Sequence, residues 1–394
     1  MHLKLSKITA SVLLLGVSLF GAEILSDAQK SSLELQKEKA IQDSEATKYQ
    51  WVKPISYTGS YQEGSAPGKS ITSTISTTQT IFQSGGIEST MKYADNIRSA
   101  SSLSIEIQKK ALIKNAYNLA FNIKKIDLQI QKQKLALANA KIDLRIKKES
   151  VTNGLLDISF LNNALLTKNG IDAALVELEF NKINLINSFK NLSTLDPYRV
   201  ELPTFTKITL EDFDKNHLEI QKTNVDIDGK KYVEDITNAN YKPYATANAS
   251  YTYDHVGVSA THPKDLTATS YGVSVVVPLD YNYYAKTGSA KADYLKSKQD
   301  LELLKIKEQN FFQTQDLKVK MIESKLSLTK ENIIVYNDLL AQNQELAGVG
   351  IKTQDDVKVI ENTRDSELLN MKIYEIDKQL ELLEIYGKIE NATI

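Results

Sequence analysis

Hydrophobic and polar residues repeat with two different periods along the chain, and the two periods predict two kinds of element. In the segment "YATANASYTYD" (residues 244–254), Ala and Tyr occupy the odd positions from 245 to 253, and polar residues occupy the even positions from 246 to 254. Side chains of a strand point alternately to opposite faces, so this segment is predicted to be a strand with one apolar and one polar face. Such a strand separates a protein core from water, or lipid from an aqueous lumen.

Strand patterns occur in two pairs. The first pair covers residues 55–62 and 71–82, and the second covers residues 244–254 and 269–280. The strand at 71–82 is rich in threonine, so its pattern alone does not fix its register. We therefore expect two antiparallel strand pairs whose alternation is clear in three strands and ambiguous in one.

Each strand pair is followed by a proline-free segment with an apolar stripe at alternating spacings of four and three. Sustained 3.5-residue periodicity predicts coiled-coil packing. A helix over residues 86–152 would be roughly 100 Å long at about 1.5 Å per residue. The first stripe consists of Leu112, Ala116, Leu119, Ile123, Ile126, Ile130, Gln133, Leu137, Ala140 and Leu144. The second stripe consists of Val319, Ile322, Leu326, Thr329, Ile333, Tyr336, Leu340, Asn343 and Ala347.

Each long helix is interrupted once near its far end. The interruptions are "TNGLLDISFL" (152–161) and "AGVGIKTQDDV" (347–357), which contain Gly154, Gly348 and Gly350. Glycine is the usual residue just after a helix C-terminus, and polar side chains such as those of "TQDD" begin helices. Both segments are therefore predicted to be tight turns that fold each long helix into a helical hairpin.

The predicted elements occur twice in the same order. "KPISYTGSY" at 53–61 corresponds to "KPYATANASY" at 242–251, and Gly154 corresponds to Gly350. We predict an internal duplication with a first repeat over residues 23–213 and a second over residues 214–394. Residues 1–22 combine lysines, a short apolar run and small residues, which predicts a signal peptide; the alternative is an N-terminal membrane anchor.

Composition narrows the function. The chain has no cysteine, which excludes disulfides, thiolate metal sites and cysteine nucleophiles. With 48 basic and 49 acidic residues it is nearly neutral, which argues against a nucleic-acid partner. The 19 tyrosines suit an envelope protein with an aromatic girdle at a membrane interface. The histidines have no metal-ligand spacing, and "QSGGIES" is no phosphate loop, so we predict neither an enzyme nor a cofactor.

Four strands of this length match the thickness of an outer membrane, but they cannot close a barrel. An open sheet edge in lipid leaves backbone groups without partners. If the strands span a membrane, the chain must oligomerise, as a dimer with about eight strands or a trimer with about twelve. The alternative is a small soluble sheet that caps a coiled coil.

The duplicated layout and several short motifs resemble the TolC-like outer-membrane channels of efflux and type I secretion. The motifs are "WVKPISYTGSY", "NYKPYATANASY", "QTIFQSGG", "NGLLDISFL" and "GVGIKTQDDV". The resemblance covers residues 23–394. It implies a homotrimer in which four strands per protomer contribute to a shared 12-stranded β-barrel and long helical hairpins form an α-barrel in the periplasm. It also implies a periplasmic adaptor and an inner-membrane transporter as partners, and a location in the outer membrane of a Gram-negative bacterium.

The same resemblance implies residue roles at the hairpin turns. The gate arginine of the family corresponds to Lys352, its first-hairpin threonine to Ser159, and the acidic residue that narrows its entrance to Asp356. Asp355 is a second acidic candidate beside it. The turns with Gly154, Leu155, Gly348 and Gly350 would dock the adaptor.

The chain departs from the family at two of these positions. Phe160 and Val359 stand where the family has acidic residues, which puts a copied gate in doubt. Asp355 and Asp356 could alternatively serve only as caps of the last helix.

These features predict a passive exit duct of a tripartite efflux pump or type I secretion system. The competing hypothesis is a periplasmic adaptor or structural coiled-coil protein without a pore. Adaptors usually need one helical hairpin, whereas this chain has two matched hairpins. The sequence does not identify the cargo.

Overall fold

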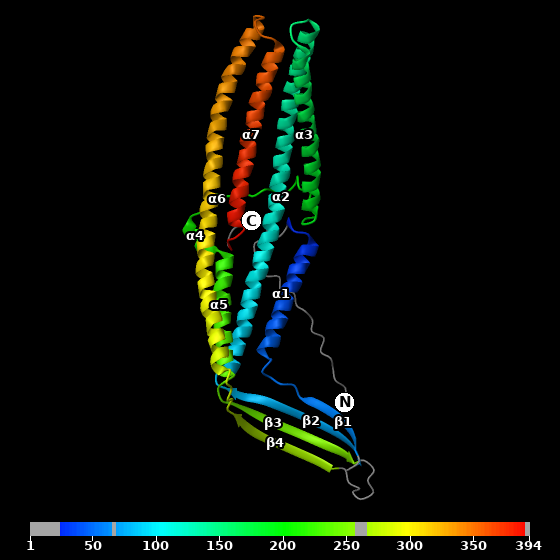
Figure 1. Ribbon diagram of the computed structural model, residues 1–394, viewed down its shortest axis with the longest axis vertical. Helices are drawn as coiled ribbons and strands as arrows, with labels where there is room; N and C mark the ends of the chain where they lie inside the picture. Colours follow the sequence, from blue (N-terminus) through cyan, green and yellow to red (C-terminus); the bar gives the residue numbers. More distant parts are fainter. Residues whose placement is uncertain (1–23, 65–67, 257–265, 391–394) are drawn as a thin grey trace. The chain divides into compact units, whose positions relative to one another are not determined.

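The computed structural model describes the chain except for residues 1–23, 65–67, 257–265 and 391–394, so the predicted signal peptide lies outside the described residues. The elements form the order helix, two strands, long helix, helix, followed by a similar series with one additional short helix (Figure 1). The helices are α1 (Asp27–Lys48), α2 (Gly86–Thr152), α3 (Ile158–Lys190), α4 (Leu210–Asn216), α5 (Leu218–Ala239), α6 (Tyr283–Gly348) and α7 (Gln354–Tyr386). The strands are β1 (Ser56–Gly64), β2 (Gly68–Gln83), β3 (Tyr244–Val256) and β4 (Leu266–Val276).

The chain folds into two compact units. Unit 1 comprises the described residues within 1–31, 110–208 and 314–394, and unit 2 comprises the described residues within 32–109 and 209–313. Each unit takes segments from both predicted repeats, and the long helices α2 and α6 each contribute to both units. The repeats at 23–213 and 214–394 therefore stay a prediction about the sequence, distinct from the compact units.

Unit 2 contains one antiparallel sheet with the strand order β1-β2-β3-β4 (Figure 1). The sheet resolves the ambiguous register of β2, which places Ile75 opposite Tyr57 on one side and Tyr251 on the other. The predicted strand at 269–280 is too long, since β4 ends at Val276. Pro278 stands two residues later and has no N–H for the ladder, so pairing stops before it.

The two faces of the sheet differ in chemistry. One face is mainly apolar and exposed, with Ser73 and Thr77 of β2 also on it, and the opposite face carries hydroxyl groups that bond one another across the strands. The exposed apolar side chains include Tyr57, Tyr61, Ile71, Ile75, Phe82, Tyr251, Tyr271, Val273 and Val275. The hydroxyl pairs are Ser56–Ser76 (3.0 Å), Ser60–Thr72 (2.5 Å), Thr74–Thr252 (3.1 Å) and Ser250–Ser270 (2.8 Å). The predicted alternation of apolar and polar faces is confirmed.

The helical part of unit 2 packs around two buried groups. Ile220 and Ile227 of α5 meet Leu301 of α6, with Tyr294 and Leu304 against them. At the junction of α4 and α5, buried His217 contacts buried Glu308 of α6 at 3.1 Å. The His217 Nδ1 also accepts a hydrogen bond from the backbone N–H of Ile220, so this side chain caps α5 while it fixes α5 against α6.

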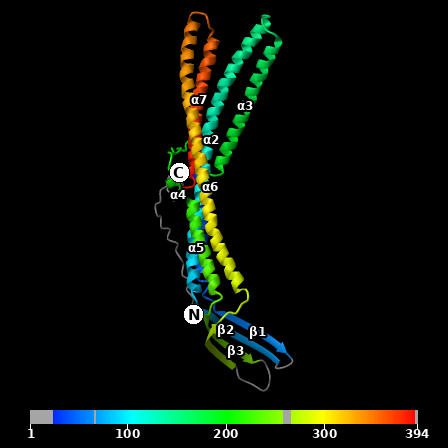
Figure 2. The same cartoon turned by 60° about the vertical axis from the view of Figure 1, so that its left-hand side comes forward.

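Unit 1 contains two helical hairpins, α2/α3 and α6/α7 (Figures 1 and 2). Within this unit α7 lies between α6 and α2. Lys318 of α6 pairs with Glu381 of α7 at 3.2 Å, and Lys125 of α2 pairs with Asp377 of α7 at 2.6 Å. α3 contacts α2, where Lys182 pairs with Asp127 at 2.8 Å.

The predicted stripes form the contacts of the long helices. Every member of the α6 stripe is buried or half-buried, with Val319 1% exposed. On α2, Ala116, Ile123, Ile126 and Ile130 are buried, and burial declines from there toward the turn. Among the described helices, none combines the length and apolarity required to cross a membrane.

Candidate functional site at the helical hairpin turns

The two hairpin turns have the same backbone design. Gly154 has φ +72° and Gly350 has φ +79°, a left-handed conformation that favours glycine because it has no Cβ. In the first turn the N–H of Leu155 donates to the carbonyl of Ser150 at 2.9 Å, and in the second the N–H of Ile351 donates to that of Leu346 at 2.9 Å. These bonds satisfy carbonyls at the end of each long helix, as in a Schellman motif. Both segments are therefore tight turns, as predicted.

Different side chains begin the return helices. Asp157 is the N-cap of α3 and accepts from the N–H of Ser159 at 2.8 Å. Thr353 and Asp356 form a capping box on α7: the N–H of Asp356 donates to Thr353 Oγ1 at 3.2 Å, and the N–H of Thr353 donates to Asp356 Oδ2 at 3.0 Å. These hydrogen bonds keep the pKa of both carboxyl groups below their usual values, through the Ser159 N–H for Asp157 and the Thr353 N–H for Asp356.

The two predicted acidic residues, Asp355 and Asp356, have different bonding partners. The Asp356 carboxylate is directed to the first turn of its own helix, which is the capping role considered for it. Asp355 forms an ion pair with Arg145 of α2 and so connects α7 to the other hairpin. Asp355 and Asp356 are thus adjacent in sequence but bond different helices.

Lys352 and Ser159 are not brought together. Among the described residues no hydrogen bond joins them; Lys352 is exposed, and its positive charge contributes to the lowered pKa of Asp356. The backbone N–H of Ser159 instead bonds Asp157 within its own turn. Phe160 lies beside Lys147, whose Nζ is 5.8 Å from the ring centroid.

The turns also expose apolar side chains. In the first turn Leu155 is 74% exposed. In the second turn Ile351 is 70% exposed, and Val349 is exposed as well. Exposed apolar residues rimmed by polar groups are typical of protein contact surfaces. Gly348 is the last residue of α6, and no heavy atom lies within 4 Å of the Cβ that a larger residue would place there.

Two residues that form bonds at the turns were missed by sequence reasoning, Asp157 and Arg145. Asp157 had a local signal, since an Asp directly before a helix is a common N-cap. Arg145 had none, because its pairing with Asp355 depends on the register of α2 against α7.

The outer faces of α3 and α6 are further candidate contact surfaces. On α3 the exposed large apolar residues are Ile158, Phe160, Leu165, Leu166, Val176, Phe180 and Ile183. On α6 they are Tyr283, Tyr284, Leu295, Leu303, Ile306, Leu317, Met321, Leu328, Ile334, Val335 and Leu339. In the described part of the chain, no group of His, Cys, Asp and Glu residues has an arrangement that would hold a metal ion.

No protein-family model and no curated protein matches the chain. Solved structures do match. The fold is that of the TolC-like outer-membrane channels, so the resemblance predicted from the sequence is confirmed at the level of the fold.

The similar structures include outer membrane protein VceC of Vibrio cholerae, with a TM-score of 0.73, 13% identity, and coverage of 92% of this chain and 93% of that one. The outer membrane channel CmeC of Campylobacter jejuni has a TM-score of 0.72, 14% identity, and coverage of 95% and 86%. The open state of the outer membrane channel MtrE of Neisseria gonorrhoeae has a TM-score of 0.65, 12% identity, and coverage of 93% and 87%.

Proposed function

We propose that this chain is an outer-membrane channel, the passive exit duct of a tripartite efflux pump or type I secretion system. The observation that carries the proposal is the four-stranded sheet, whose exposed apolar face opposes a face of bonded hydroxyl groups. Lipid would be the suitable environment for the apolar face, and an aqueous lumen would be suitable for the face with hydroxyl groups. The likeness to structures described as outer membrane channels supports the same function.

The proposed assembly is a homotrimer. β1 and β4 are the edge strands of the sheet, and an open edge in lipid is costly. Three copies would give a closed barrel of about twelve strands. The exposed apolar faces of α3 and α6 would be buried between neighbouring copies, which would close the helices into an α-barrel in the periplasm.

The proposed partners are a periplasmic adaptor and an inner-membrane transporter that supplies the energy. The turns with Gly154, Leu155, Gly348 and Gly350 are the proposed docking surface for the adaptor, because apolar side chains project there from a fixed backbone. In the trimer, three copies of Asp356 would form a negative ring that favours cations, and each carboxylate keeps its charge while it caps α7. Lys352, Ser159 and Asp355 are proposed gate residues, with Asp355 acting through Arg145.

Fractionation and conductance test this function together. The protein should need detergent for extraction from outer membranes, and the purified trimer should conduct ions across planar lipid bilayers. Recovery as a monomer from the periplasm without detergent would instead support the alternative, an adaptor or structural coiled-coil protein without a pore.

A further inference from the structure

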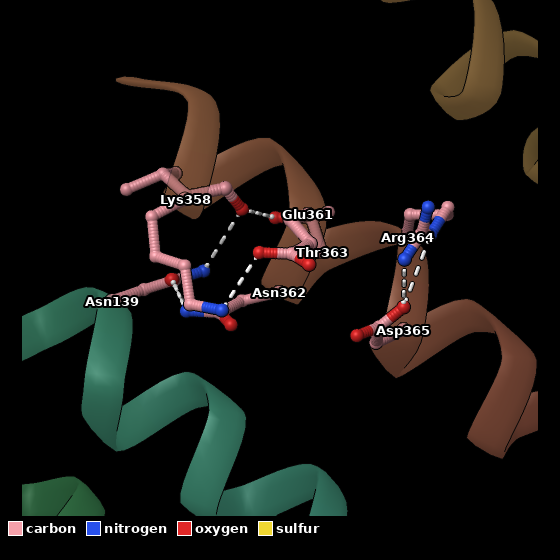
Figure 3. A network of polar contacts seen from close by, with 8 residues as sticks. Asn139, Lys358, Glu361, Asn362, Thr363, Arg364 and Asp365 are labelled. Carbon is pink, nitrogen blue, oxygen red and sulfur yellow. Dashed lines mark hydrogen bonds and ion pairs between the residues drawn. The ribbon is translucent and has the colours of Figure 1, made fainter. Parts of the chain in front are cut away.

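The single tryptophan of the chain has a buried polar atom without a partner. A buried side chain usually has one, as Asn362 has: its Nδ2 donates to Asn139 Oδ1 at 2.7 Å (Figure 3). Trp51 as a whole is half-buried, but its Nε1 is one of three buried side-chain nitrogen or oxygen atoms of the described residues that have no hydrogen-bond partner. Because an N–H group that is withdrawn from water without an acceptor is unfavourable, Trp51 indicates a missing acceptor.

The backbone around Trp51 is fixed against the sheet. The side chain of Gln79 on β2 donates from Nε2 to the carbonyl of Trp51 at 2.9 Å, and its Oε1 accepts from the N–H of Lys53 at 2.9 Å. A cavity of about 610 Å³ lies beside Trp51 and is also lined by residues of β2, α2, α5 and β3. The indole is therefore held in place next to a space that can receive another side chain.

A closed barrel places a second copy beside this segment. β1 and β4 are the two edges of the sheet, so in a barrel of identical copies each β1 neighbours β4 of the next copy. β1 leads away from the helices and β4 leads back to them, so these two strands would be antiparallel. Residues 49–55, which precede β1 and contain Trp51, would then lie beside residues 277–282, which follow β4 of the next copy.

The two faces of the sheet restrict the register of β1 against β4. On both strands the exposed apolar side chains stand mainly at odd positions, so odd residues must lie opposite odd residues if the barrel is to keep one apolar face. Among the registers that meet this condition, one aligns the helix ends of the strands and pairs Ser56 with Val276. It sets apolar against apolar and hydroxyl against hydroxyl, in the pairs Tyr57–Val275, Tyr61–Tyr271 and Thr58–Ser274.

Two prolines support the same register. Pro54 stands two residues before β1, and Pro278 stands two residues after β4. Neither has an N–H group, so neither can continue the ladder. With Ser56 opposite Val276, the prolines lie opposite each other, and pairing between the copies ends at the same level on both strands. A shift by two residues in either direction would instead set one proline opposite the terminal residue of a strand.

This register also sets Tyr281 of one copy opposite Trp51 of the next. Tyr281 is fully exposed in a single copy. Its backbone is held in a turn, since the N–H of Asn282 donates to Asp280 Oδ1 at 2.8 Å and the N–H of Tyr283 donates to the carbonyl of Asp280 at 3.2 Å. A tyrosine offers an apolar ring that can cover an indole and an oxygen that can accept from its N–H.

We propose that Tyr281 of the neighbouring copy completes a socket at Trp51, and that this contact fixes the register of β1 against β4 at each subunit boundary. The proposal rests on the trimer of the proposed channel and adds to it the pairing of specific residues. The ring of Tyr281 covers the indole, and its oxygen accepts from Nε1. The next copy thus supplies the acceptor that a single copy lacks.

Disulfide cross-linking tests the register in the full-length protein, because the chain has no cysteine of its own. Thr58→Cys with Ser274→Cys would place two thiols directly opposite each other between copies, within reach of a disulfide. Within one copy β2 and β3 separate these positions, so a covalent trimer on a denaturing gel can come only from contact between copies. Oxidation should convert most of the protein to that trimer.

Two matched controls shift one cysteine by two residues on the same face. Thr58→Cys is combined with Gly272→Cys or with Val276→Cys, which would lie diagonally at roughly 7–8 Å, beyond the reach of a disulfide. Each control should give about tenfold less covalent trimer than the pair with Ser274→Cys. If either control cross-links as well as that pair does, the register is wrong.

Fluorescence of the single tryptophan tests the socket itself. In detergent, the wild-type trimer should emit at a shorter wavelength than Tyr281→Ala, and acrylamide should quench the variant about threefold more efficiently, because its indole is uncovered. Tyr284→Ala removes another exposed tyrosine that the register leaves outside the socket, and it should match the wild-type protein. Equal quenching of the wild-type protein and Tyr281→Ala would overturn the socket.

The outcomes separate this contact from the channel function. A wild-type protein that is a monomer in detergent, or that inserts into bilayers but never conducts, would sink the proposed function. A conducting trimer that cross-links through a control pair, or whose tryptophan is unaffected by Tyr281→Ala, would sink only the socket. Size-exclusion chromatography with light scattering on each variant distinguishes an uncovered indole from loss of the trimer.

Discussion

The return helices α3 and α7 have equal lengths, 33 residues each, and occupy corresponding places in the two hairpins, yet their surfaces differ. α3 exposes a series of large apolar side chains, whereas α7, which is described over its full length, contributes none to the exposed large hydrophobic residues. The reason lies in their neighbours. α7 forms ion pairs with both α6 and α2, while α3 lies beside α2 and is paired with it through Lys182 and Asp127 (Figures 1 and 2).

The comparison separates what the two hairpins share from what differs between them. The turns retain a left-handed glycine and the same capping hydrogen bond. The side chains that follow differ, with an apolar surface after the first turn and an acidic capping box after the second. The two turns therefore have the same backbone geometry, whereas the surface chemistry differs with the environment of each helix.

The largest effect is expected from charge on the apolar face of α3. The double substitution Val176→Glu and Phe180→Glu should abolish the detergent-resistant trimer, because burying two carboxylates between copies is highly unfavourable. Size-exclusion chromatography with light scattering measures the loss. Asn181→Asp, at an exposed polar position beside the face, should leave the trimer intact. A trimer that survives both carboxylates would show that α3 is not a subunit contact.

The turn glycines should be the next most sensitive. Gly154→Ala and Gly350→Ala should each destabilise their turn by about 1–2 kcal/mol, the cost of a left-handed conformation for a residue with a Cβ. Hydrogen exchange of the two turns measures this. Gly170→Ala, in open space within α3, should instead stabilise its helix by about 0.5–1 kcal/mol. Unequal costs at the two turns would contradict their common backbone design.

A smaller loss is expected from the cap of α7. Thr353→Ala removes the side-chain oxygen that accepts from the N–H of Asp356, and should cost about 1 kcal/mol of local stability. Hydrogen exchange over residues 354–357 should accelerate while the first turn of α3 is unaffected. Protection that is unchanged at α7 would mean that the capping box contributes little.

The smallest effect concerns pH. Asp356 has a lowered pKa in the folded chain, so its carboxylate stabilises α7 at pH values above its usual pKa of about 3.9, and this contribution is lost as pH falls through the lowered value. Protection of the first turn of α7 should therefore fall only in strong acid. In Asp356→Asn this pH dependence should disappear, and a profile identical to that of the wild-type protein would rule out the carboxylate as its source.

The same residue tests the proposed ring. Asp356→Ala should weaken block by multivalent cations in single-channel recordings. Thr353→Ala is the matched control, since it disturbs the same cap but keeps the charge. Block that weakens equally in both variants would assign the effect to the cap.

Much of the architecture could be predicted from local pattern. The helix expected over residues 86–152 has those bounds in α2, because its stripe is long and its ends are marked by glycines. The short helix α4 was missed, since seven residues carry too little periodicity to distinguish a helix from a linker. β2 could not be placed in register because Ser and Thr occupy both of its faces.

The candidate site was harder to predict than the fold. Caps depend on residues three positions apart, so the box formed by Thr353 and Asp356 was within reach of the sequence. The partner of Arg145 is more than two hundred positions away, and a shift of one helical turn between α2 and α7 would change it. Only the packed structure supplies that register.

The rows of serine and threonine on one face of the sheet have a consequence for what could travel past them. A hydroxyl group rotates, so it donates to one neighbour and accepts from the next without a fixed preference. A wall built from such groups offers every passing molecule a weak, reversible bond and holds none of them. In the proposed channel, a lining without selectivity of this kind would leave the selection of cargo to the inner-membrane transporter.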